Sequence, residues 1–396
     1  MVRRQGQMRY AWFAYLIAHV SVFVHLRALG DLGFRDVYLY HFWQRVSPVP
    51  VFQMDWVYPI GAAVPMSLIR FVSDQNHYLL AWLAMVALAN AVLVYFVGTR
   101  LRNGVVAVVW WMAFIALIGP TAFARLDAFS SALAIAAVVL LGRQTTVASG
   151  LLASAGWVKV AHFFWLPIIF VTSKKPWREV FVPFAIVTAF VVAVAWLGGA
   201  GSRLFGFVVN QNVRGLQAES TLGAWFHASR MRGGEFWLEY NEEIYTVEFV
   251  GDLPNLVARY SDYVMFAAVG LVTLLTWRAM RRRRSEQMRW ITWGLLGVTV
   301  SLLLFNKVGS PQLMVWLAAP MMLLISQSGK SVSKLTATIL AGLVLVAGGA
   351  SQIIFPLFYQ EFFDLEPWVM AAYFARSVIL VVLFLTSVIA LARRVR

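Results

Sequence analysis

The chain has 396 residues, 61% of them hydrophobic and only 13% charged, with a mean hydropathy of +0.72. A soluble protein of this length cannot bury so much apolar surface, so the composition excludes a soluble enzyme, and the lack of cysteine excludes disulfides and thiol chemistry. The net charge of +15 reports on membrane topology in such a chain, and we expect no nucleic-acid partner.

Apolar blocks of about 17 to 25 residues, long enough to cross about 30 Å of hydrocarbon, recur along the chain. This pattern predicts an all-α polytopic membrane protein, folded as a single domain over residues 1–396. The first block follows Arg3, Arg4 and Arg9 without a cleavage pattern, which indicates a retained first span. About twelve spans are expected, near residues 10–29, 76–98, 104–119, 127–142, 145–156, 160–173, 179–199, 258–280, 288–305, 311–327, 333–350 and 368–392.

Basic residues are divided unevenly between the two sides of these spans. With the N-terminus in the cytoplasm, 20 of the 33 Lys and Arg residues but only 2 of the 18 acids lie on the cytoplasmic side. The opposite side carries 13 basic residues and 16 acids. The positive-inside rule therefore predicts a plasma-membrane protein with both termini in the cytoplasm.

Two segments, 30–75 and 200–257, are too long and too polar to be simple connectors, and both fall on the outer side. Within the first, residues 59–73 are apolar, short and contain proline, which favours a helix lying in the membrane interface. The second is rich in Glu, Arg, Trp and Tyr and is expected to fold as an outer cap.

The blocks 145–156 and 160–173 are too short to cross the membrane alone, at about 18 and 21 Å by 1.5 Å per residue. They are typical of a broken hairpin with Lys159 at its outward tip. Non-helical backbone at that depth persists only when it is buried in protein or lines a wet cavity.

Charged and polar side chains gather at the outer ends of five separate segments. A charge at membrane depth costs about 2.5 to 3.5 kcal/mol, so each one calls for a reason. Their common depth predicts a single outward-facing pocket. Its members are expected to be Asp36, Arg125, Asp127, Lys159, His162, Arg214, Gln217, Glu219, Asn306, Lys307 and Gln312.

The residue types in this pocket suit one reaction. The cations Arg125, Lys159, Arg214 and Lys307 suit a phosphate at headgroup level. The carboxylate of Asp36 on the first outer loop suits a general base for an incoming hydroxyl. Together they predict sugar transfer from a lipid-linked phosphate donor to an alcohol, with fixed cations stabilising the departing phosphate.

The ordered motifs resemble a known family. They are DVYLYHFW, DWVYPIGA, RLDAF, K-x-x-H, RGLQAES and NKVGSPQLMVWL, over roughly residues 30–320. They resemble the C-class (GT-C) integral-membrane glycosyltransferases, above all the actinobacterial family 87 mannosyltransferases. The chain departs from that family's usual YPP at Tyr58-Pro59-Ile60.

The resemblance implies a polyprenyl-phosphate-mannose donor, a lipid-linked glycan acceptor, and an acidic residue of the first outer loop, here Asp36, as catalytic base. We expect no cofactor and no metal, membrane lipids as surroundings, and a monomer. The remaining polar residues would contact substrate; they are Asp55, Tyr58, Asp127, His162, Gln217, Glu219, Asn306 and Gln312.

Other roles stay open for several of these residues. Asp31 and Asp55 are rivals for the base, although Asp55 fits a role in positioning the loop or the acceptor. Arg125 and Asp127 could pair with each other. Lys159 could be a snorkelling lysine, and its neighbour at the third position, His162, an ordinary core histidine.

Two further functions also stay open. An arabinofuranosyltransferase using decaprenyl-phosphate-arabinose is a close alternative, because charges do not separate two neutral sugars on one type of phosphate. A lipid-linked-sugar flippase or transporter is the alternative from another class. A transporter should carry charges at the bilayer midplane and paired repeats, and this sequence has neither.

Overall fold

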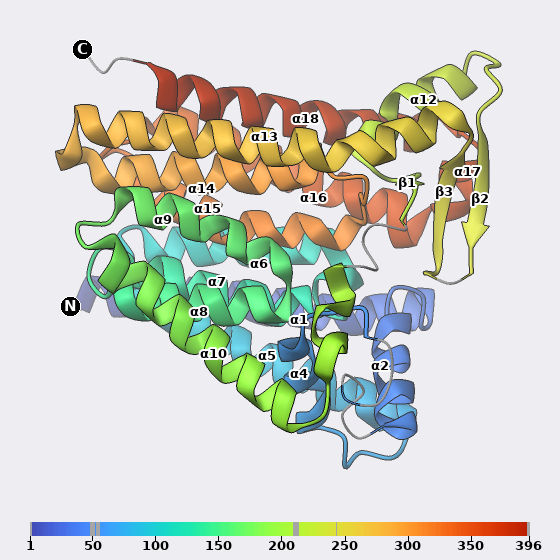
Figure 1. Cartoon of the computed structure of the whole chain (residues 1–396), viewed down its shortest axis with the longest axis horizontal. Helices are drawn as coiled ribbons and strands as arrows, with labels where there is room; N and C mark the ends of the chain where they lie inside the picture. The colour runs from blue at the N-terminus through green and yellow to red at the C-terminus, as the bar shows by residue number, and fades with distance from the viewer. Residues whose placement is uncertain (1, 48–51, 53–55, 209–213, 243, 394–396) are drawn as a thin grey trace.

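The computed structural model describes residues 2–47, 52, 56–208, 214–242 and 244–393. Long helices lie side by side along one direction, with both chain termini at one end of the bundle (Figure 1). The segments 30–75 and 200–257 lie together at the other end. We call these the terminal end and the loop end.

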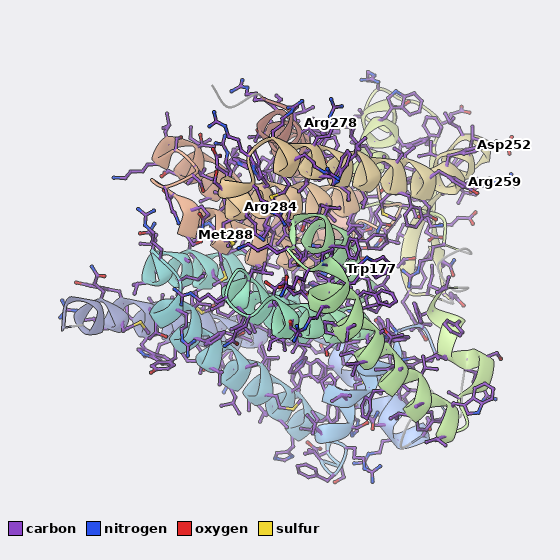
Figure 2. All side chains as sticks on the ribbon, turned by 60° about the vertical axis from the view of Figure 1, so that its left-hand side comes forward. Trp177, Asp252, Arg259, Arg278, Arg284 and Met288 are labelled. Carbon is purple, nitrogen blue, oxygen red and sulfur yellow. The ribbon has the colours of Figure 1, made fainter. Side chains whose placement is uncertain are left out.

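Seven helical segments are long and apolar enough to cross a membrane. Each coincides with one of the expected spans, and together they make this a membrane protein. They are α1 (Val2–Leu29), α5 (Gln75–Arg100), α6 (Gly104–Ile118) with η2 (Gly119–Ala122), η4 (Trp177–Phe181) with α10 (Val182–Leu197), α13 (Asp252–Arg282), α16 (Lys334–Gln352) with η9 (Ile353–Leu357), and α18 (Pro367–Ala392). Three of the side chains labelled in Figure 2, Asp252, Arg259 and Arg278, lie along α13.

The other five expected spans are helical but shorter, so the count of twelve crossings is not confirmed. They form α7 (Asp127–Leu140), α8 (Thr145–Val158), η3 (Val160–Trp165) with α9 (Leu166–Thr172), α14 (Gln287–Leu304), and η8 (Pro311–Leu317) with α15 (Ala318–Gln327). Every residue of α14 from Trp290 to Leu304 is buried. Because α14 is surrounded by the rest of the protein, it need not match the hydrocarbon thickness.

The hairpin of α8 and α9 is broken at Lys159, as the sequence predicts. α8 ends at Val158, and Lys159 has an extended backbone with φ −148° and ψ 116°. A 3-10 turn then leads into α9. The break holds the lysine at the loop end of the bundle.

The first loop forms helices that cross the ends of the bundle. α2 (Arg35–Val46) packs on α5 and lies across the long helices in Figure 1. It buries Val37, Tyr40 and Gln44. Within the stretch 59–73, η1 (Ile60–Ala62) runs directly into α4 (Ala63–Leu68), so the predicted short helix is present.

The second loop contains a small antiparallel sheet, which departs from a purely helical fold. Its strands are ordered β1-β3-β2, and the aromatic and β-branched residues of β2 and β3 favour extended backbone. Around them lie short helices, and α17 packs close to the cap. The bounds are η5 (Gly201–Phe205), β1 (Leu216–Gln217), η6 (Thr221–Gly223), α12 (Ala224–Arg230), β2 (Trp237–Asn241), β3 (Thr246–Val250) and α17 (Tyr359–Phe363). A further 3-10 turn, η7 (Arg284–Glu286), follows α13 at the terminal end.

Candidate active site

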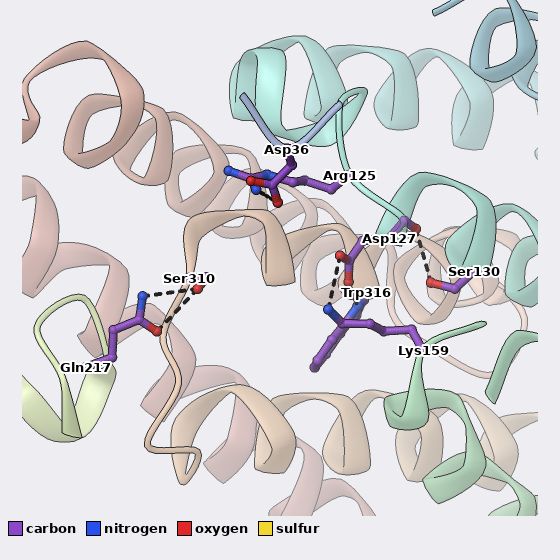
Figure 3. Close-up of polar contacts among 8 residues, drawn as sticks. All are labelled: Asp36, Arg125, Asp127, Ser130, Lys159, Gln217, Ser310 and Trp316. Carbon is purple, nitrogen blue, oxygen red and sulfur yellow. Dashed lines mark hydrogen bonds and ion pairs between the residues drawn. The ribbon is translucent and has the colours of Figure 1, made fainter. Parts of the chain in front are cut away.

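Asp36 and Arg125 form an ion pair at the loop end (Figure 3). Asp36 lies in the first turn of α2, where the helix dipole favours a carboxylate. Arg125 comes from the turn between η2 and α7, and the two side chains are 26% and 13% exposed. Burial lowers the pKa of Arg125 to about 10, still well above neutral, so the guanidinium remains charged. The pair therefore holds an ionised carboxylate at a partly open position.

Asp127 and Arg125 do not form an ion pair with each other. The Asp127 carboxylate instead faces two other elements. Its Oδ1 accepts a hydrogen bond from Trp316 Nε1 of η8 at 2.7 Å, and its Oδ2 lies 3.6 Å from Lys159 Nζ. Asp127 is 2% exposed. A buried carboxylate thus joins α7, η8 and the break after α8 (Figure 3).

Tyr58 interacts with two of the predicted cations. Lys159 Nζ is 5.2 Å from the centre of the Tyr58 ring, close enough for a cation–π contact. Burial and Asp127 raise the pKa of Tyr58, and nearby Arg214 lowers it. The phenol therefore keeps its proton at neutral pH and can donate a hydrogen bond.

Arg214 forms no ion pair with a described carboxylate, and its Nε lacks a hydrogen-bond partner although it is buried. Lys159 is 22% exposed and holds Asp127 only at the long distance given above. Both cations thus retain donors for an added anion. Lys159 contacts the Tyr58 ring directly, and the charge of Arg214 lowers the pKa of the same phenol, so both cations act on one side chain.

The RGLQAES and NKVGSPQ motifs lie against each other. Gln217 accepts from the Gly309 N–H at 3.0 Å and donates to Ser310 Oγ at 3.1 Å. A Cβ at Gly309 would lie 2.1 Å from Ser220 Cα, so only glycine permits this approach. Gln217 therefore fixes the two loops together rather than facing open space.

Lys307 is nearly enclosed, with 5% of its side chain exposed, and its Nζ lies 3.4 Å from Asp262 Oδ2 of α13. Asn306 folds the same loop by accepting from the Val308 N–H at 2.9 Å. Gln312 is half-buried in η8. The contacts of Lys307 leave it less available to a phosphate than Arg214 or Lys159.

Glu219 lies in a buried cluster with the C-terminal helices. Tyr359 of α17 donates to Glu219 Oε1 at 2.5 Å, and Arg376 of α18 donates to the Glu219 carbonyl. Burial raises the pKa of Glu219. Tyr373 donates to the next carbonyl, that of Ser220. These contacts tie the cap to α17 and α18.

His162 is 1% exposed, and neither ring nitrogen has a hydrogen-bond partner. Its ring centre is 5.1 Å from that of Trp165 and 6.4 Å from that of Trp316. The break at Lys159 means that the two residues do not share a continuous helix. Asp55 lies outside the described residues.

The sequence analysis did not identify four residues that contact the predicted site residues. They are Trp316, Asp262, Tyr359 and Arg376. Arg376 carries a detectable signal, since a charge inside the apolar block 368–392 calls for a buried partner. The other three have no local signal. Among the described residues, no three His, Asp or Glu side chains form a group that could hold a metal ion.

The sequence model that describes glycosyltransferase family 87 matches residues 56–306, which is more than half of the chain. No curated protein and no solved structure matches the chain significantly.

Proposed function

Because the chain belongs to glycosyltransferase family 87, we propose that it transfers a mannosyl residue from polyprenyl-phosphate-mannose to a hydroxyl of a lipid-linked glycan. The observation that carries this proposal is the ion pair of Asp36 with Arg125, which lies in the same part of the structure as Lys159 and Asp127 (Figure 3). A base for the acceptor and cations for the phosphate are the two requirements of this transfer. Membership of a glycosyltransferase family also argues against the flippase alternative.

We propose Asp36 as the general base. Its carboxylate takes the proton of the acceptor hydroxyl, the hydroxyl oxygen forms a bond to the anomeric carbon, and the bond from that carbon to the phosphate oxygen breaks. Arg125 keeps the carboxylate ionised before the acceptor arrives. Asp36 precedes the family match, so this role depends on the site geometry and the motif.

The departing polyprenyl phosphate gains negative charge, which fixed cations can stabilise. Arg214 is the strongest candidate because it has no ion-pair partner among the described carboxylates. Lys159 follows, and the hydroxyl of Tyr58, whose ring Lys159 contacts, can add a hydrogen bond. Lys307 and Arg125 remain weaker candidates, since the Lys307 side chain is only 5% exposed, against 22% for Lys159, and Arg125 is paired with the proposed base.

One displacement with inversion is the simplest course. A retaining route needs a second carboxylate free to attack the sugar, as in the glycosidases that serve here as an analogy. Asp127 is the second carboxylate of the site, but it is buried and already accepts a hydrogen bond from Trp316 Nε1. We therefore propose that a β-linked donor yields an α-mannoside, without a metal ion.

The donor is tested by incubating purified protein with radiolabelled polyprenyl-phosphate-mannose and, separately, decaprenyl-phosphate-arabinose. Transfer of mannose alone is expected; transfer of arabinose alone would make the chain an arabinofuranosyltransferase. NMR of the product gives the anomeric configuration, and a β product from a β donor would require a retaining route. Activity lost in EDTA and restored by Mg²⁺ or Mn²⁺ would overturn the metal-free proposal.

The loop end is proposed to face away from the cytoplasm, on the basis of the charge distribution. The chain has no cysteine, so single cysteines can be introduced without background. A cysteine at Met231, which is 44% exposed, should react with an impermeant maleimide in intact cells. A cysteine at the exposed Ser285 should react only after lysis, and the reverse result would invert the orientation.

A further inference from the structure

A groove of about 570 Å³ opens at the terminal end, far from the site described above. It lies between the turn that joins α9 to η4 and the end of α13, where Figure 2 labels Trp177 and Arg284. The lining combines cations with aromatic and apolar side chains. It consists of Phe170, Val171, Ser173, Lys174, Pro176, Trp277, Met280, Arg281 and Arg284.

The three cations of the groove are exposed and uncompensated. Lys174, Arg281 and Arg284 form no ion pair with any carboxylate in the described part of the chain. The nearest acids along the chain are engaged by other side chains. Glu286 lies 3.4 Å from Arg283 and 2.8 Å from Arg289, and Glu179 accepts from the Ser173 hydroxyl.

The floor below these cations is apolar and aromatic. Phe170 packs edge-to-face with Trp177, with ring centres 5.4 Å apart. The guanidinium carbon of Arg281 lies 5.2 Å from the centre of the Trp277 ring, which is itself 41% exposed. Tryptophan beside cations is typical of the level where lipid headgroups meet acyl chains.

We propose that this groove binds an anionic glycerophospholipid. The phosphodiester contacts Lys174, Arg281 and Arg284, while one acyl chain lies along Phe170 and Trp277. Charge alone would serve to orient the helices, but orientation requires neither a groove nor an aromatic floor. Two separate turns supply the cations, so the bound lipid bridges α9 and α13, which also pack against each other.

The test uses the full chain in detergent, titrated with fluorescent phosphatidylglycerol. Replacing Lys174, Arg281 and Arg284 together by Gln should weaken binding about 10- to 150-fold, from about 1 kcal/mol for each cation near an anionic lipid. Phosphatidylcholine should bind the unaltered protein far more weakly, because it carries no net charge. If the triple variant does not elute as a single species, Arg284→Gln alone should give a smaller loss in the same direction.

A matched control removes three exposed cations from other turns at the terminal end. They are Arg102, Lys330 and Lys334, none of which lines the groove. Their joint replacement by Gln should leave phosphatidylglycerol affinity unchanged. Equal weakening in both triple variants, equal affinity for phosphatidylcholine, or full displacement of the lipid by millimolar inorganic phosphate would each overturn the proposal.

Discussion

Replacing Asp36 by Asn tests the proposed base most directly. Asparagine keeps the size of the side chain and can still accept a hydrogen bond from Arg125, but it takes up no proton. Turnover should therefore fall by about 10² to 10⁴, the usual contribution of a general base. Donor binding should survive, because Asp36 is not proposed to contact the phosphate.

The same substitution also perturbs the fold, and the structure gives the scale of that effect. Arg125 is 13% exposed and would lose its only ion-pair partner among the described carboxylates. Breaking a fully buried pair costs about 3 to 5 kcal/mol; since Asp36 is 26% exposed, we expect about 1 to 3 kcal/mol. A melting curve of the detergent-solubilised protein measures this loss.

A double variant separates chemistry from stability. Adding Arg125→Gln to Asp36→Asn removes the uncompensated charge, so stability should recover in part while turnover stays low. Turnover is measured as transfer of radiolabelled sugar at saturating donor. Asp31→Asn replaces an exposed acid on the same loop as Asp36; it is the control and should remain active. Near-normal turnover in Asp36→Asn, or its recovery in the double variant, would refute Asp36 as the base.

Three further predictions concern the donor, the cap and its response to pH. Arg214→Gln removes charge-assisted contacts of about 1.5 to 3 kcal/mol, so donor affinity should weaken about 10- to 150-fold in a binding titration. If the donor Kd is unchanged but transfer to the acceptor is lost, the loop that carries Arg214 binds the acceptor instead. Arg376→Met removes the donor to the Glu219 carbonyl, and we expect a loss of about 1 to 3 kcal/mol in a thermal melt; an unaltered melting temperature would contradict the tie between cap and α18. Burial lowers the pKa of His227 from 6.5 to about 4. Between pH 6.5 and pH 4 the His227 imidazole is protonated in the unfolded chain but neutral in the folded protein. The contribution of this histidine to stability is therefore complete above pH 6.5 and falls by up to about 3 kcal/mol toward pH 4. His227→Gln should lessen the loss between pH 7.5 and 5, and equal losses in both proteins would exclude this histidine as the cause.

The length of the apolar blocks in the sequence was enough to predict the long spans. The blocks at 76–98 and 258–280 lie within α5 and α13, because a long apolar run in a membrane must satisfy its backbone as a helix. The break at Lys159 was also predicted, since the two flanking blocks are too short. In contrast, the small sheet of the cap was missed, because β2 and β3 have five residues each and β1 only two, and such short strands carry too little pattern to be distinguished from a loop.

The candidate site, like the fold, was only partly predictable from the sequence. The sequence placed its charged residues at common depths, and that much follows from the order of the spans. It did not reveal that Asp36 pairs with Arg125, or that Asp127 binds Trp316, 189 residues away. Such pairs depend on how each helix is rotated and which helices are neighbours. Those features are decided by side-chain packing throughout the bundle, and only the tertiary structure contains them.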